Sequence, residues 1–200
     1  MRELPCLMNG NGVRATLDGR KTQTRRPVVG VDRVDKFIRM DNDRAIFDSL
    51  PPISDAFESI GDPRMFISRR NPLGVPGDLL YVRETHCLVV PSGDDLPPGA
   101  ILVDDSPYGP VEVVYRANVE LGVLAWCSGL RWRSSIHMPK WAARLWLLNT
   151  DNRVEKGPYI SETDARAEGF ENAAAFMAWW ERQYPGMDWR FVTSYEVIER

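Results

Sequence analysis

Residues 13–27 encode a helix, a glycine turn and a strand in direct succession. Residues 13–17 have a helical pattern, and Gly19 stands where a helix end favours a residue that tolerates positive φ. Residues 21–26 then alternate in character as a strand does, and Pro27 ends that strand because proline cannot donate to a sheet ladder. Side chains two apart on a strand share a face. The pattern predicts one face with Thr22, Thr24 and Arg26, and the opposite face with Lys21, Gln23 and Arg25.

The same stretch is a basic island on an acidic chain. The whole protein has 25 Lys and Arg against 28 Asp and Glu, a net charge of −3. Residues 14–26 alone carry five cations and one acid, so their local charge is +4. Clustered Lys and Arg favour an anion such as phosphate. The alternative is a solvated strand edge whose charges protect it against aggregation. The cations are Arg14, Arg20, Lys21, Arg25 and Arg26.

The pattern Gly19-x-Lys21-x-x-Thr24-x-Arg26 resembles the G-x-K-x-x-E-x-R signature of the ASCH domain. Thr24 stands where many members of the family have glutamate. This threonine variant resembles the branch of small bacterial ASCH proteins that act as N4-acetylcytidine amidohydrolases. Further blocks resemble the ASCH-domain proteins of bacteriophages and prophages. In order they are VRATLDGRKTQTRR, PGDLLYVRET, YRA, WRSSIHMPKWA and ISETDARAEG, before a Trp-rich helix and a last strand.

This resemblance implies a catalytic set of Lys21, Thr24 and Glu168. A threonine hydroxyl needs a nearby base to become a nucleophile, and lysine serves as that base only when its pKa is lowered. The cationic neighbours Arg20, Arg25 and Arg26 favour such lowering and are predicted ligand contacts. Glu168 matches the family glutamate near the end of a short helix, where it could carry a proton to the leaving amine. Alternatively, Glu168 is merely an exposed helix residue.

Two other groups are candidate ligand-binding residues. Arg83 and Glu84 end an apolar strand at residues 79–85, a position suited either to a site or to an ion pair at the rim of a barrel. Trp132 and Arg133 belong to a stretch in which tryptophan and arginine are interleaved. Such residues can stack on bases and contact phosphates, although tryptophan is also a common core residue.

The order of elements predicts an α+β fold. Strands are expected at residues 4–8, 79–85, 111–117, 144–155 and 191–198. A short helix is expected between Ser161 and Gly169, a second one over residues 172–184, and a single helical turn at 137–142. The resemblance specifies the architecture as a PUA-like (ASCH) mixed β-barrel with flanking helices. We expect one domain over residues 1–200, with insertions at about 28–71 and 91–110; local hairpins are expected in the first, with a brief helix at 53–60.

Composition limits the remaining possibilities. No apolar run approaches 18 residues, and the N-terminus lacks the apolar core of a signal peptide, so we expect a cytoplasmic protein without membrane contact. Three widely spaced cysteines support neither a disulfide framework nor a zinc site, so we expect reduced thiols, no metal and no cofactor. A pI near 5.5 disfavours broad, non-specific duplex binding.

The sequence therefore predicts a protein that binds RNA, a nucleotide or a modified nucleoside in a basic barrel pocket. Hydrolysis of the amide of an N4-acylated cytidine is the enzymatic form of this hypothesis. A non-catalytic nucleic-acid-binding module that uses the same groove is the alternative. Ribonuclease activity ranks third, because no histidine pair or cluster of metal-binding carboxylates is apparent. The natural substrate and the oligomeric state are left open.

Overall fold

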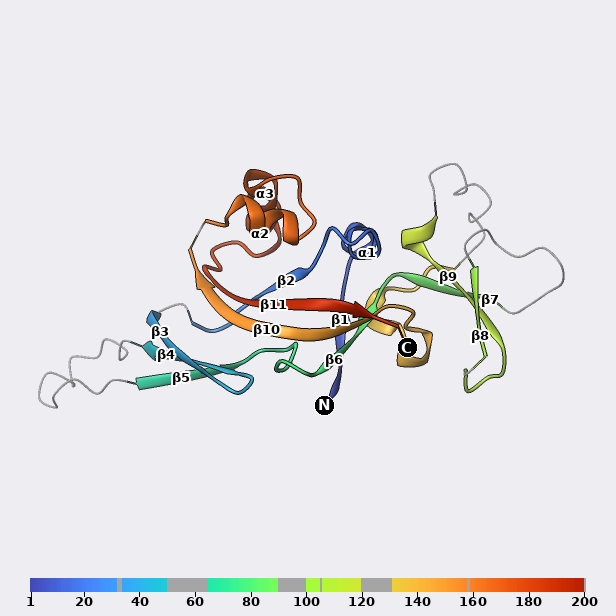
Figure 1. Ribbon diagram of the computed structural model, residues 1–200, viewed down its shortest axis with the longest axis horizontal. Helices are drawn as coiled ribbons and strands as arrows, with labels where there is room; N and C mark the ends of the chain where they lie inside the picture. The colour runs from blue at the N-terminus through green and yellow to red at the C-terminus, as the bar shows by residue number, and fades with distance from the viewer. Residues whose placement is uncertain are drawn as a thin grey trace, which may run out of the picture.

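The computed structural model describes residues 1–31, 34–49, 65–89, 100–104, 106–119, 131–157 and 159–199. Within these ranges the chain forms eleven strands in three sheets and three α-helices, so the predicted α+β class is confirmed (Figure 1). Figure 1 shows β10 and β11 as long curved strands through the middle of the molecule, with the α-helices on one side of them. None of the described helices has the length and apolar character needed to span a membrane.

The central sheet has five strands in the order β1-β6-β10-β11-β2. β1 (Glu3–Leu7) runs parallel to β6 (Leu79–Arg83), and the other pairs, which involve β10 (Trp146–Lys156), β11 (Trp189–Ile198) and β2 (Gln23–Pro27), are antiparallel. The apolar strand predicted at 79–85 lies between two neighbours, as its two apolar faces indicate. β1 and β2 are the opposite edges of this sheet, and the described strands form no closed barrel.

Two small sheets lie at opposite ends of the molecule (Figure 1). One contains β3 (Val34–Asp41), β4 (Arg44–Ser49) and β5 (Met65–Arg70), and its β3–β4 pair is a hairpin of the kind expected at 28–71. The other contains β7 (His86–Val89), β9 (Val111–Tyr115) and β8 (Ala100–Val103) in that order. The brief helix expected at residues 53–60 lies outside the described residues.

The three α-helices lie where the sequence predicts them, although α1 begins three residues before the predicted start at residue 13. Asn9 caps α1 (Gly10–Leu17), and Gly19 follows with a φ of 71°. Ser161 caps α2 (Glu162–Ala167) by accepting from the Asp164 N–H, as expected for a capping residue. α3 (Ala173–Gln183) completes the set. The helical turn expected at 137–142 is instead a pair of 3-10 turns, Ser135–His137 and Lys140–Ala142, and a third 3-10 turn spans Arg116–Asn118.

Separate apolar clusters attach these parts to one another. The largest joins β1, β6, β10 and α1 through side chains such as Cys6, Val13, Leu80 and Leu147. Phe176 and Trp180 form an aromatic cluster between α3 and α2. The sheet β3-β4-β5 packs its inner side chains against β11. Ala165 of α2 and Phe191 of β11 belong to these clusters, and β2 is paired with β11; these three elements carry the candidate site.

Candidate functional site

Lys21 and Glu168 meet although 147 residues separate them. Lys21 lies just before β2 and pairs through its backbone with Glu168, the residue at the end of α2. The neighbouring Thr22 N–H donates to the Ala167 carbonyl over 2.8 Å. Gly169, with a φ of 84°, turns the chain away immediately afterwards. Both charged side chains are buried, with 6% of Lys21 and 5% of Glu168 exposed.

All three protons of the Lys21 ammonium have an acceptor. Its Nζ lies 2.5 Å from Glu168 Oε2, 2.7 Å from the Gln23 carbonyl oxygen and 3.0 Å from the Glu168 carbonyl oxygen. Burial lowers the pKa of Lys21 from its usual value, and the charge and hydrogen bond of Glu168 oppose that shift. The Lys21–Glu168 pair is therefore a place where a proton can move between an amine and a carboxylate over a short distance.

Arg25 holds the other oxygen of Glu168. Its Nη1 donates to Glu168 Oε1 over 3.2 Å, while Nε and Nη2 donate to the two oxygens of Glu155 over 3.1 and 3.2 Å. Asp164 Oδ2 lies 3.6 Å from Arg25 Nη2, and Arg153 bridges Asp164 and Glu155. Lys21, Arg25 and Arg153 thus face three acids, so this part of the basic island is electrically balanced.

Thr24 lies on the opposite face of β2 from Arg25, as the alternation predicts. It is buried, and its Oγ1 accepts a hydrogen bond from Arg26 Nη1 over 3.1 Å. Arg26 also donates to the Leu7 carbonyl over 2.5 Å, and its Nη2 lies 3.8 Å from Cys6 Sγ. Among the hydrogen bonds of the described residues, none joins Thr24 to Lys21 or Glu168. Arg26 is thus committed to the protein backbone and to Thr24.

The sequence pattern gave no indication of three buried polar residues beside the motif. Thr16 Oγ1 and Tyr195 Oη lie 3.1 Å apart, and Cys6 lies against Arg26. Burial raises the pKa of the Cys6 thiol and that of the Tyr195 hydroxyl, so both stay protonated at neutral pH. These side chains come from β1, α1 and β11, and only the folded sheet places them together.

The remaining cations of the motif have local partners. Arg20 is exposed and pairs with Asp18 over 2.8 Å. Arg14, on α1, donates to Asn11 and to the Ala117 carbonyl. The predicted anion site is therefore not a free cationic patch, because acids and carbonyl groups distant in the sequence occupy most of its charges.

Arg83 and Glu84 have separate partners. Glu84 is buried and accepts from Arg144 Nε and Nη2 over 2.9 and 3.1 Å, whereas Arg83 donates to the Ile136 carbonyl. Burial raises the pKa of Glu84, and the hydrogen bond and charge of Arg144 oppose the shift. Glu84 thus belongs to an ion pair, as the alternative proposed, but with a partner 60 residues away.

Trp132 and Arg133 lie near the connection between the end of β6 and the start of β7, because Arg133 pairs with His86. Arg116 stands over the Trp132 ring, 5.1 Å from its centroid, and the Arg133 backbone pairs with His86 while its side chain is exposed. The structure therefore brings Lys21, Arg25 and Glu168 together, and Thr24 accepts from Arg26 on the other face of β2. Among the hydrogen bonds and ion pairs of the described residues, none joins Lys21 or Glu168 to Arg83, Glu84, Trp132 or Arg133. Trp126, the other tryptophan of the stretch in which tryptophan and arginine are interleaved, lies outside the described residues.

No protein-family model, curated protein or solved structure matches the chain. Within the described residues, no three His, Cys, Asp or Glu side chains are grouped so as to hold a metal ion. The assignment of a function consequently depends on the motif and on the geometry around Lys21.

Proposed function

We propose that this chain is an ASCH-like protein that binds RNA, a nucleotide or a modified nucleoside and hydrolyses the amide of an N4-acylated cytidine. The observation that carries the proposal is the buried contact of 2.5 Å between Lys21 Nζ and Glu168 Oε2. It supports the resemblance because the motif and the ISETDARAEG block supply one residue each. The curved central sheet is, in this proposal, an opened variant of a PUA-like barrel.

The proposed chemistry begins with a proton transfer inside the Lys21–Glu168 pair. Transfer from the ammonium to the carboxylate leaves a neutral amine and a carboxylic acid, which burial favours over two charges. The Lys21 amine then removes the proton of the Thr24 hydroxyl as its oxygen attacks the acyl carbon. The bond from that carbon to N4 breaks, and N4 takes the proton of Glu168. Water hydrolyses the resulting Thr24 ester.

This scheme requires the Thr24 hydroxyl, which has no hydrogen bond to Lys21 or Glu168 among the described residues, to change its position. The hydroxyl now accepts from Arg26, so it must turn toward Lys21 when a substrate is bound. Arg26 can then donate to the oxyanion that develops on the acyl group.

Binding without turnover is the second candidate function. The observation that favours it over turnover is that the three Lys21 donors are already satisfied within the protein, so that Lys21 is not free to act as a base. In that form a cytidine-like base would replace one of these acceptors, and no ester would form.

Turnover of N4-acetylcytidine by purified variants separates these candidates. We expect Thr24→Val and Lys21→Ala to abolish cytidine release, and Thr24→Ser to retain part of it. The double variant should be little worse than the worse single variant, because the residues act as one unit. Arg182→Ala, which removes an exposed cation of α3, is the control and should keep full activity. A wild-type protein that binds the nucleoside without releasing cytidine would establish the binder, and one that does neither would contradict the proposal.

A further inference from the structure

The small sheet β3-β4-β5 has one buried face and one open face. Its inner face packs Ala45, Phe47 and Ile67 into a cluster with Trp189 and Phe191 of β11. Because strand side chains alternate, the neighbouring residues of β4 and β5 point outward. The outward residues are Arg44, Ile46 and Asp48 of β4, and Phe66, Ser68 and Arg70 of β5. We call this side the outer face.

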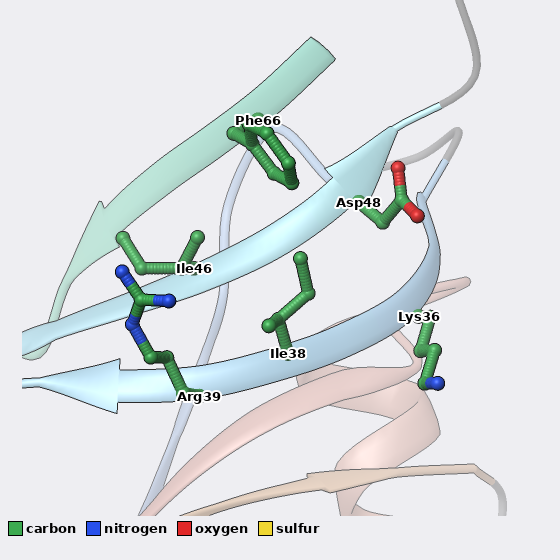
Figure 2. A pocket seen from close by; sticks show the side chains of 6 residues that line it. All are labelled: Lys36, Ile38, Arg39, Ile46, Asp48 and Phe66. Carbon is green, nitrogen blue, oxygen red and sulfur yellow. The ribbon is translucent and has the colours of Figure 1, made fainter. Parts of the chain in front are cut away.

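A hollow of about 450 Å³ lies on the outer face (Figure 2). It is lined by Lys36, Ile38, Arg39, Ile46, Asp48 and Phe66. Figure 2 shows Phe66, Ile46 and Ile38 beside one another on three adjacent strands. Phe66 is 65% exposed and Ile38 is 39% exposed, which is unusual for large apolar side chains that lie next to each other on a sheet. The floor of the hollow is therefore apolar, formed by the Phe66 ring and the side chains of Ile38 and Ile46.

Cations surround this apolar floor. Lys36 and Arg39 are exposed, and neither forms an ion pair with another described residue. Arg44 donates to Ser68, and Arg70 pairs with Asp43 beyond the hollow. Asp48 is the single carboxylate among the six lining residues. On a protein with a net charge of −3, two cations without an ion pair among the described residues therefore lie next to an exposed aromatic ring.

We propose that the outer face binds a single strand of nucleic acid, with a base stacked on Phe66 and the neighbouring phosphates on Lys36 and Arg39. Stacking on an aromatic side chain requires an unpaired base, and cations along the groove then follow the backbone of the strand. A duplex offers no free base face to Phe66. The inference rests on the proposed function and deepens it, because it makes the substrate a base within a single strand.

The test is the affinity of the full-length protein for a short fluorescein-labelled single-stranded RNA, measured by anisotropy. Phe66→Ala should weaken binding by about fivefold to a hundredfold, the usual contribution of one stacked base. Phe66→Tyr should restore it, since a ring is retained. Lys36→Glu combined with Arg39→Glu should weaken binding and flatten its salt dependence. Two controls should leave binding unchanged: Tyr108→Ala, which removes an aromatic ring that is 82% exposed in the turn between β8 and β9, and Arg182→Glu on α3.

Three results would overturn the inference. The first is that the wild-type protein binds no single-stranded RNA, and the second is that Phe66→Ala leaves the affinity unchanged. The third is that the protein sediments as a dimer that Phe66→Ala dissociates, which would make the outer face an interface between copies. Release of cytidine from free N4-acetylcytidine is measured in parallel on the same variants. RNA binding that depends on Phe66 in a protein without turnover keeps the inference and removes the hydrolase. Turnover without such binding removes the inference alone.

Discussion

Glu168 gives its two carboxylate oxygens to two different buried cations, Lys21 and Arg25. Removing one partner of a buried ion pair leaves a charge without full compensation. If Lys21 is lost, Arg25 still compensates part of the negative charge of Glu168, which reduces the loss of stability. The residue-scale consequence is that Lys21 has a structural role even before any catalytic role is considered.

Lys21→Met should lower the free energy of unfolding by about 3 kcal/mol, the lower end of the usual cost of breaking a buried pair. Urea denaturation measures this difference. Arg20→Met is the matched control, since its exposed pair with Asp18 should contribute less than about 1 kcal/mol. Equal effects of the two substitutions would contradict the geometry described for Lys21.

The resemblance predicted Lys21, Thr24 and Glu168 as one set; the structure joins Lys21 to Glu168, and the surroundings of these residues could not be predicted. Glu155 lies 130 residues from Arg25, and nothing in the local pattern indicates that this acid will neutralise it. The pairing of Glu84 with Arg144 escaped prediction for the same reason. Long-range partners of charged residues depend on sheet topology, which local propensity does not determine.

At the scale of elements, the turn after α2 positions Glu168 beside Lys21, just before β2. Gly169 has a φ of 84°, and a Cβ at this position would lie 2.8 Å from Ala15 Cβ of α1. Both the positive φ and the close approach favour glycine. The packing of α1 against this turn therefore fixes the distance between Glu168 and Lys21.

Gly169→Ala should destabilise the protein by more than the 1–2 kcal/mol that left-handed backbone alone costs, about twice that amount in all. Thermal unfolding is the measurement. Gly19→Ala is the control, because Gly19 also has a positive φ but its Cβ would meet nothing within 4 Å. If the two variants melted at the same temperature, the contact with Ala15 would have no energetic weight.

Asp78 ties the start of β1 to the turn before β6. Burial acts to raise its pKa, but hydrogen bonds from the Arg2 side chain and from the backbone N–H groups of Val75 and Arg2 outweigh burial and lower the pKa to about 2. The usual value is 3.8. Since the folded pKa lies below the unfolded one, the carboxylate stabilises the fold at neutral pH, and this contribution is lost as the pH falls from about 4 to about 2.

Asp78→Asn should therefore cost about 2 kcal/mol at neutral pH and almost nothing below pH 2. Denaturation midpoints measured across this range test the expectation. A constant difference between wild type and Asp78→Asn at every pH would argue against the Arg2 contacts as its cause.

At the scale of the whole molecule, the buried cations of the basic island differ from the cations of the outer face. Lys21 and Arg25 are neutralised by acids, whereas Lys36 and Arg39 are exposed and form no ion pair with any residue that the structure describes. Nucleoside binding near Lys21 should accordingly be almost independent of salt, and RNA binding should weaken as salt rises, because only the latter releases counterions. Calorimetric titrations at two salt concentrations distinguish the two. Equal salt dependence would contradict the separation.

The sequence predicted the central sheet and the helices better than the two small sheets. Apolar runs such as residues 79–85 and clear caps such as Ser161 specify their elements locally. β3, β4 and β5 have mixed polar patterns with a bulge in β3, and they become recognisable only against their buried partners Phe47 and Trp189. The resemblance predicted that the central sheet would close into a barrel, whereas the described strands form an open sheet. Closure depends on how several strands are arranged, so the propensity of a single strand does not determine it.

The central claim is that Lys21, Thr24 and Glu168 form the site for an acylated cytidine. Its most direct test is a crystal structure of the Thr24→Val variant grown with N4-acetylcytidine, because valine keeps the shape of threonine without its hydroxyl. We predict that the acyl carbonyl lies within hydrogen-bond distance of Arg26 and that N4 lies beside Lys21 and Glu168. Clear density for the nucleoside elsewhere, with the Lys21–Glu168 pair unchanged and closed, would contradict the account.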